Sequence, residues 1–369
     1  MPTIAQVDIY RYALPLAQPL TFGGETIDTR SGLLLRLVDT EGREGVGDSA
    51  PLPHFSDESL EAAEQAARAL QDMLPGQTLP DGPATVDRWL RATTGTEDWP
   101  ASVQCGIDGA IWSLLAAARG ITISDLLSPR ARTTVTLNAL VTDAAEPAQA
   151  ARQLQEEGYR ALKLKVGRHA LEADIRRVSA VLDVLDNAAV LRLDANRAWS
   201  WAEAVTAARR LSWEQIEYIE EPLADPSQLA DLAQTYDVPV ALDEATRSLT
   251  LNELDDHAYA QAVILKPTLL GGLAQAWRWA RRAHRLGLVP VVSSSFESGI
   301  GLRGLVALAA AFPVATPMGL GTYRYLHRDV GTQRLPFHPP TLDVPALLQA
   351  PCRWDPAVVR SVSTSLADE

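Results

Sequence analysis

Lysine is rare in this chain, and its placement is the first chemical signal in the sequence. Of the 33 lysine and arginine residues only three are lysine, namely Lys163, Lys165 and Lys266. A guanidinium stays protonated, whereas a lysine loses its proton more readily when it is buried or lies beside another cation. All three lysines lie in apolar, strand-like runs, where a buried lysine is costly without a partner. Lys163 and Lys165 would share one face of a strand, so they suit the work of a general base.

Three acidic residues end the strand-like segments that follow these lysines. They are Asp194, Glu220 and Asp243, spaced at about one strand-and-helix unit each. Each acid alone could cap a helix or pair with arginine, but three in succession would repel one another in a single cavity unless they held a cation. Oxygen ligands suit Mg²⁺, with Mn²⁺ as a possible substitute, better than zinc, and none of the 6 histidines lies at these strand ends.

The combination of lysines and a metal site predicts one reaction class. A carboxylate held by Mg²⁺ makes the neighbouring C–H acidic, because the cation stabilises the enediolate that forms. Lys165 and Lys266, on strands either side of the acids, could then act as base, acid or electrostatic partner. The predicted reaction is proton abstraction α to a carboxylate. The residues predicted to bind the substrate also lie at strand ends, and they are Ser293, Ser294, Asn196 and Gly319. For Arg30 a surface role is favoured over a substrate contact, because arginine is so abundant.

The order of secondary-structure patterns predicts two units. Residues 1–40 read as strands, residues 45–54 as a loop and residues 58–118 as helices, without alternation, which indicates an α+β unit. From residue 135 onward, strands alternate with amphipathic helices, which indicates a parallel sheet. A closed barrel brings the carboxyl ends of its strands to one mouth, where barrels of this kind place their active sites. The polar strand ends therefore favour a TIM-like barrel over residues 131–324, with an N-terminal α+β capping domain over residues 1–130 that is completed by about residues 325–369. The predicted strands are residues 135–141, 161–166, 190–194, 217–220, 238–243, 262–266, 289–293 and 316–320.

Composition excludes several classes of partner. The chain has 369 residues, 47% of them hydrophobic, and a net charge of −13, which disfavours a nucleic-acid surface. Its two cysteines fit a reducing, cytoplasmic location, and we expect neither a signal peptide nor a membrane span. We expect a small-molecule carboxylate as substrate, with a homo-oligomer as a possible assembly.

The motifs that carry these residues resemble the enolase superfamily, specifically its muconate-lactonizing-type subgroup and, within it, the o-succinylbenzoate synthase family. That resemblance implies an α+β cap on a modified (β/α)₇β barrel, Mg²⁺ dependence, and syn dehydration of 2-succinyl-6-hydroxy-2,4-cyclohexadiene-1-carboxylate in menaquinone or phylloquinone synthesis. It also implies that Lys165 is the base, that Lys266 faces it across the enediolate, and that Lys163 tunes Lys165. The matching segments are residues 49–56 (SAPLPHFS), 192–199 (RLDANRAW), 263–268 (VILKPT) and 293–302 (SSSFESGIGL).

Two positions depart from the family pattern. The segment Gly319-Leu320-Gly321-Thr322 stands where these synthases often have Gly-Leu-Asp-Thr, and His54 stands where glycine is common. Both departures concern substrate identity more than reaction class.

Other activities remain open at this point. Racemases and epimerases of the subgroup use the same lysines, and N-succinylamino acid or other N-acylamino acid racemisation is the main alternative. Dipeptide epimerases typically place an acidic pair after the last strand, which Gly319 and Gly321 do not supply. Muconate-type cycloisomerisation comes third. A non-catalytic binding barrel is the least favoured, because all six successive strand ends have polar side chains: Lys165, Asp194, Glu220, Asp243, Lys266 and Ser293 to Ser295.

Overall fold

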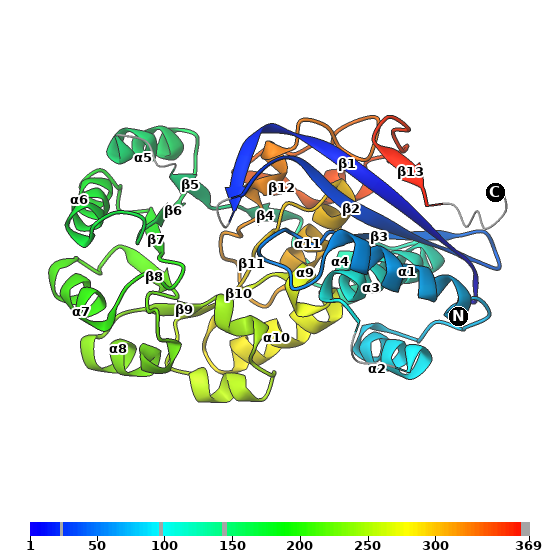
Figure 1. Ribbon diagram of the computed structural model, residues 1–369, viewed down its shortest axis with the longest axis horizontal. Helices are drawn as coiled ribbons and strands as arrows, with labels where there is room; N and C mark the ends of the chain where they lie inside the picture. The colour runs from blue at the N-terminus through cyan, green and yellow to red at the C-terminus, as the bar shows by residue number, and fades with distance from the viewer. Residues whose placement is uncertain (23–24, 96–98, 142–145, 363–369) are drawn as a thin grey trace.

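Two long antiparallel strands begin the chain in the computed structural model, which describes residues 1–22, 25–95, 99–141 and 146–362. Strands β1 (Ile4–Phe22) and β2 (Glu25–Asp39) form a hairpin with β3 (Glu44–Ser49) beside β2. The short β13 (Val359–Ser361) pairs with the other edge of β1, so the end of the described chain joins the N-terminal sheet. Helices α1 (Leu60–Met73), α2 (Pro83–Thr94) and α3 (Ala101–Arg119) follow, and the α4 turn (Ile123–Leu127) leads out of this unit (Figure 1).

Strand β3 corrects the sequence prediction, which placed a loop at residues 45–54. Its two glycines face helix α3 at very short range. A Cβ on Gly45 would lie 2.2 Å from the carbonyl oxygen of Ala110, and one on Gly47 would lie 1.8 Å from that of Gly106. Glycine is therefore used here for close approach of two backbones, which a propensity-based reading mistakes for a turn.

Helix α3 is the most apolar long helix of the cap. Within the described residues it is the one helix whose length and composition alone would let it cross a membrane, and most of that apolar stretch is buried. It packs against β3, β2 and the α9 turn (Pro267–Leu270), so it is the core helix that joins the cap to the second unit. Its end is marked by Gly120 in the left-handed conformation, which terminates the helix without steric cost.

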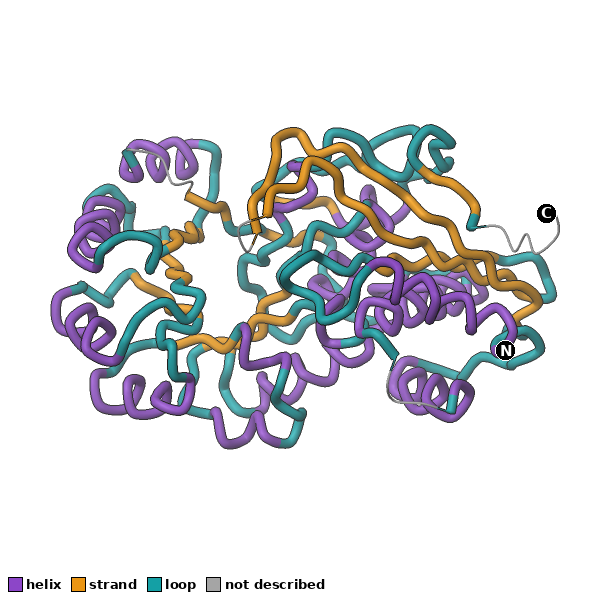
Figure 2. The backbone as a smooth tube through the Cα atoms, viewed as in Figure 1, coloured by secondary structure: helices purple, strands orange, loops and turns teal. Residues whose placement is uncertain are grey.

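The second unit is a curled sheet of seven parallel strands with helices outside it. The strand order β11-β10-β9-β8-β7-β6-β5 is sequential, so each strand lies beside the one before it in the chain, as expected for successive β–α units. Figure 2 shows the short strands on the inside and the helices around them. The strands are β5 (Ala139–Val141), β6 (Ala161–Lys165), β7 (Val190–Asp194), β8 (Ile216–Glu220), β9 (Val240–Leu242), β10 (Ala262–Leu265) and β11 (Val289–Val292). The helices are α5 (Pro147–Glu156), α6 (Leu171–Leu182), α7 (Trp201–Arg210), α8 (Leu229–Tyr236), α10 (Leu273–Arg285) and α11 (Gly299–Ala311).

The sheet closes through a single extended segment. Parallel bridges join Met318 to Leu137 on one side and Gly319 to Ser293 on the other, and Gly319 N–H donates to the carbonyl of Val292 at 2.8 Å. Residues 318–319 therefore occupy the eighth strand position, which confirms the predicted modified (β/α)₇β barrel. The strand predicted over residues 316–320 is reduced to these bridges.

The strand predicted over residues 135–141 is also shorter than expected, because it is divided in two. Its first part, β4 (Thr134–Thr136), leaves the barrel sheet and pairs with β12 (Thr341–Asp343), just before helix α12 (Val344–Gln349). The part that remains in the barrel is β5, preceded by the Leu137 bridge to the closing segment.

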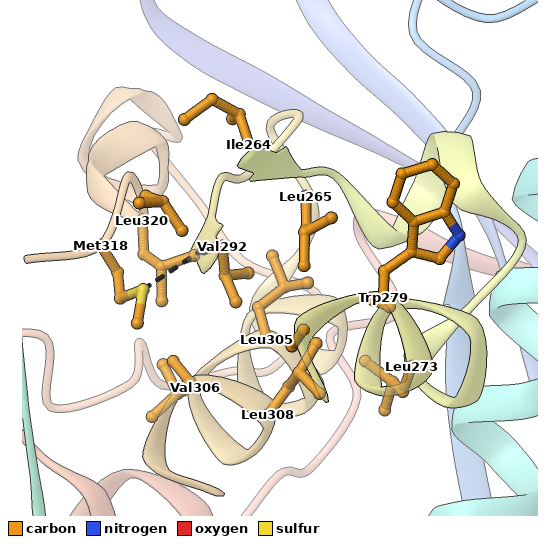
Figure 3. Packing of buried hydrophobic residues seen from close by; sticks show 14 of the residues in the cluster. Ile264, Leu265, Leu273, Trp279, Val292, Leu305, Val306, Leu308, Met318 and Leu320 are labelled. Atoms are coloured by element: carbon orange, nitrogen blue, oxygen red, sulfur yellow. Dashed lines mark hydrogen bonds between the residues drawn. The ribbon is translucent and has the colours of Figure 1, made fainter. Parts of the chain in front are cut away.

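The barrel core packs β10, β11 and the closing segment against α10 and α11. Figure 3 shows Val292 and Met318 beside Leu305 and Val306 of α11, with Val292 N–H donating to Met318 Sδ at 3.2 Å. These side chains are almost fully buried, so the helices that cover the sheet hold the strand ends in a fixed arrangement.

Arg30 also differs from the sequence prediction. Its side chain is 1% exposed rather than at the surface, and it lies between cap and barrel. The guanidinium donates to the carbonyls of Ala50 and Pro51 in the cap and of Phe296 after β11. It therefore serves as a structural clamp between the two units.

Candidate active site

The two lysines of β6 enter the same cavity but have different partners. Lys163 Nζ lies 2.7 Å from Asp194 Oδ2 and 2.6 Å from Glu220 Oε2. Lys165 Nζ lies 2.6 Å from Asp194 Oδ2 and 2.7 Å from the amide oxygen of Asn196. The strand register explains this meeting, because Lys165, Asp194 and Glu220 are paired across β6, β7 and β8 at one level of the barrel.

The three acids converge as a group. One carboxylate oxygen from each of Asp194, Glu220 and Asp243 lies within 4.8 Å of the others, and all three residues are buried. Lys266 approaches from the far side, with Nζ 2.6 and 2.7 Å from the two carboxylate oxygens of Asp243. An all-carboxylate set of this kind fits a divalent cation such as Mg²⁺. The sequence-predicted lysines and acids are therefore brought together in one place.

Burial and close pairing shift the pKa values of these groups in opposite directions. Burial, together with Asp194 and Asp243, raises the pKa of Glu220 to about 7 although Lys163 opposes it. Burial also acts to raise the pKa of Asp194, but Lys163 and Lys165 outweigh it and hold that pKa well below its ordinary value. Burial acts to lower the pKa of Lys266, but the charge and hydrogen bonds of the Asp243 carboxylate act in the opposite direction, and the net shift of this pKa is upward. The lysines thus balance the buried carboxylates charge for charge.

The chain turns sharply after the barrel strands β7, β8 and β11. Non-glycine residues with positive φ occur at Asn196 (44°), Arg197 (60°), Glu221 (37°) and Phe296 (61°). Such conformations are uncommon and cluster at functional sites, where the surrounding structure holds them.

Glu221 stabilises the turns after β7 and β9 through hydrogen bonds, a role that the sequence analysis did not predict. One of its carboxylate oxygens accepts from the N–H groups of Asp243 and Ala245, at 3.1 and 2.8 Å, and the other accepts from Arg197 Nε at 3.0 Å. The sequence signal for Glu221 was its position directly after the candidate metal ligand Glu220. The role of Glu221 depends on tertiary contacts, which the sequence does not show.

Asn196 links the base candidate to a further acid. Its amide oxygen accepts from Lys165, and its amide nitrogen donates to Glu244 Oε1 at 2.9 Å. Burial and the neighbouring Asp243 raise the pKa of Glu244. These two hydrogen bonds fix the orientation of the Asn196 amide, and the amide in turn fixes the position of the Lys165 ammonium group.

The three lysines, the three clustered acids and Asn196 line one cavity of about 580 Å³, which is in the size range of small-molecule sites. The four residues predicted to bind substrate line it too, namely Ser293, Ser294, Asn196 and Gly319. The loops around positions 54 and 321 were expected near the substrate, but the individual contributions of the cap and of the loops were not predicted, because no local pattern marks them. These further lining residues include Leu20, Thr21, Leu52, Phe55, Arg168, Thr322, Arg324 and Tyr325.

The two departures from the family pattern lie at this cavity or beside it. Gly321 lines the cavity, and His54 lies in the sequence between Leu52 and Phe55, which also line it. His54 has a φ of 64°, a left-handed conformation that glycine adopts more easily. This conformation explains why glycine is common there.

Comparison with known proteins shows two family matches. Residues 146–348 match the model described as enolase C-terminal domain-like, and residues 4–113 match the MenC N-terminal domain. An o-succinylbenzoate synthase of Pectobacterium atrosepticum is 32% identical over 338 residues, which is 90% of this chain and 94% of that protein. One from Edwardsiella ictaluri is 32% identical over 86% of this chain and 90% of its own length.

Solved structures share the fold at lower identity. A muconate lactonizing enzyme from Pseudomonas fluorescens, complexed with muconolactone, has a TM-score of 0.81 at 22% identity, covering 93% of this chain and 94% of that one. The L-Ala-D/L-Glu epimerase of Bacillus subtilis has a TM-score of 0.80 at 24% identity, covering 92% and 95%. The N-succinyl Arg/Lys racemase of Bacillus cereus has a TM-score of 0.81 at 23% identity, covering 93% of each chain. At these identities the likeness describes the fold alone.

Proposed function

The chain belongs to the o-succinylbenzoate synthase family of the enolase superfamily, and from this premise we propose that it catalyses the Mg²⁺-dependent syn dehydration of 2-succinyl-6-hydroxy-2,4-cyclohexadiene-1-carboxylate. It is a carbon–oxygen lyase of the hydro-lyase class, and its matching MenC domain connects it with menaquinone biosynthesis. We further propose a cytoplasmic location and leave a homo-oligomer as a possible assembly.

The observation that carries this proposal is the pair of lysines on either side of the acid cluster. Lys165 removes the proton α to the ring carboxylate and then returns it to the hydroxyl group on the adjacent carbon, so that this group leaves as water and a ring double bond forms. Lys266, across the cavity and directly after β10, supports the negative charge that develops on the substrate, and Lys163 stays charged between Asp194 and Glu220. A divalent cation held by Asp194, Glu220 and Asp243 would stabilise the same charge as a Lewis acid.

Turnover with a defined metal tests the proposal. The purified protein, freed of metal with EDTA, should be inactive and should regain o-succinylbenzoate formation with Mg²⁺, and with Mn²⁺ as a substitute. Asp243→Asn should bind Mn²⁺ at least about tenfold more weakly, because a neutral amide replaces a charged ligand. Asp255→Asn removes a surface acid of the same type and should not change the affinity. No product with either metal would refute the proposed function.

The racemase alternative is separated by comparison of substrates. The same lysine pair could exchange the α-proton of an N-succinylamino acid, which also has a succinyl carboxylate. We expect kcat/KM for the dehydration to exceed that for racemisation of N-succinylamino acids. Comparable values would replace the single function with a dual one.

A further inference from the structure

The short 3₁₀ helix η4 (Gly321–Tyr325) forms the cavity wall where cap and barrel meet. It is fixed from both sides: Leu326 bridges Leu16 of β1, and His327 N–H donates to the carbonyl of Pro15 at 2.8 Å. Thr322 Oγ1 lies 2.7 Å from Ser294 Oγ of the barrel. Residues of η4 are therefore held against the substrate cavity by the fold itself.

Arg324 is the charged residue of this helix, and its side chain lies on an aromatic wall. Its guanidinium carbon is 4.9 Å from the centre of the Tyr325 ring, and Nη2 donates to Tyr325 Oη at 2.9 Å. The Tyr325 ring in turn packs against Phe296, with ring centres 5.9 Å apart. Among the described residues no carboxylate lies within ion-pair distance of Arg324. Its hydrogen-bond donors beyond the one to Tyr325 are thus available to a ligand.

The charges that line the cavity leave a positive surplus. Three carboxylates, Asp194, Glu220 and Asp243, are matched by the three lysines, and the described lining adds the guanidinium group of Arg324 with no further acid. Gly321 opens η4 three residues before Arg324 and lines the same cavity without a charged side chain. In a chain of net charge −13 this local excess favours an anionic group away from the metal-ligand acids.

We propose that Arg324 binds the terminal carboxylate of the substrate's succinyl chain and so selects a dicarboxylate. The inference rests on the proposed function, which supplies a substrate with one carboxylate on its ring and another at the end of a flexible arm. A guanidinium bonds a carboxylate through two parallel N–H donors, and stacking on Tyr325 limits the freedom that Arg324 loses on binding. The hydroxyl pair of Ser294 and Thr322 offers neutral donors on the same wall.

The test compares Arg324→Gln with Arg328→Gln, which removes the same charge four residues along from an exposed side chain outside the cavity lining. Arg324→Gln should raise KM for the substrate and Kd for the product o-succinylbenzoate by about 10- to 100-fold, the range for a lost charged hydrogen bond, with little change in kcat. Arg328→Gln should change neither constant, and Arg324→Lys should recover part of the affinity.

A second ligand removes the ambiguity of a general structural effect. The product analogue in which the succinyl carboxylate is replaced by a primary amide should bind wild type and Arg324→Gln equally. Equal weakening of both ligands, or a Kd for the diacid in Arg324→Gln that matches Arg328→Gln, would overturn the inference. If wild type fails to dehydrate the proposed substrate but still prefers the diacid through Arg324, the proposed function fails and the assignment of Arg324 stands.

Discussion

Lys163 and Lys165 are two residues apart on β6, yet their side chains have different hydrogen-bond and ion-pair partners. Lys163 contacts two carboxylates, Asp194 and Glu220, whose charges raise its pKa well above the ordinary value although burial opposes them. Lys165 shares Asp194 but has the neutral amide of Asn196 as its other partner. Lys163 is therefore held as a cation between two carboxylates, whereas Lys165 contacts one carboxylate and a neutral amide, and it is Lys165 that we propose as the base.

The lysine requirement leads to the first prediction. Lys165→Arg keeps the positive charge at the site but replaces a titratable amine with a group that stays protonated, so kcat should fall by about 10²–10⁴-fold. Turnover assays under saturating Mg²⁺ measure the loss. The thermal midpoint and Mn²⁺ affinity of the variant should stay near those of wild type. A variant that retains wild-type kcat would show that position 165 needs only charge.

Rarity and recurrence made the central residues predictable. The three lysines stood out against many arginines, and the acids recurred once in each β–α unit, so both sets could be identified before any coordinates. Arg30 and Glu221 share their residue types with many surface positions, and their roles come from carbonyls and N–H groups supplied by distant segments. Arg324 reaches the cavity because the fold places η4 in its wall. No local pattern encodes such partners.

At the scale of elements, the close contact between β3 and α3 leads to the second prediction. Gly47→Ala would place a methyl group 1.8 Å from the carbonyl oxygen of Gly106, a backbone atom that cannot move aside without shifting the helix. We expect a loss of about 3 kcal/mol or more in the free energy of unfolding, measured by urea denaturation. Gly82→Ala is the matched control, because nothing lies within 4 Å of its added Cβ and its φ of 176° is extended. Equal stability of the two variants would contradict the packing argument.

The same contact shows what sequence periodicity could and could not predict. The β–α alternation from residue 135 onward predicted the barrel strands to within a few residues, because each buried strand is a continuous apolar run between turn signals. The glycines of β3 were misread as a loop, since the reason for them lies on another element. The closing segment at residues 318–319 was predicted too long, because its pairing consists of isolated bridges that an apolar run does not reveal.

For the whole molecule, the clamp between cap and barrel leads to the third prediction. Arg30→Met keeps most of the side-chain volume but removes the donors to the carbonyls of Ala50, Pro51 and Phe296. Buried carbonyls without donors are costly, so the free energy of unfolding should fall by about 3 kcal/mol. KM should rise as well, because Leu52, Phe55 and Phe296 line the cavity beside this clamp. Arg11→Met, which removes an exposed arginine paired only with surface glutamates, should alter neither quantity appreciably.

The interface between the two units also contains a buried carboxyl whose titration can be followed, and it leads to the fourth prediction. Glu297, after β11, accepts from Thr268 Oγ1 and from Ser295 N–H at 2.7 Å each. Burial raises its pKa, and the nearby carboxyl of Asp48 from the cap acts in the same direction. The folded protein thus holds the proton of Glu297 at a pH where the unfolded chain has released it.

This difference fixes the sign of the pH dependence. A carboxyl with a raised native pKa makes wild type lose stability as pH rises from the ordinary carboxyl range through the native pKa, after which the loss stays constant. Glu297→Gln does not titrate, so any hydrogen bond it forfeits adds a constant offset and leaves the slope unaffected. The free energy of unfolding of Glu297→Gln minus that of wild type should therefore increase with pH across this window. Urea denaturation of both proteins at several pH values measures the difference. A difference that is flat, or that falls with pH, would mean that Glu297 is ionised at the interface and that cap and barrel are joined there by a charge.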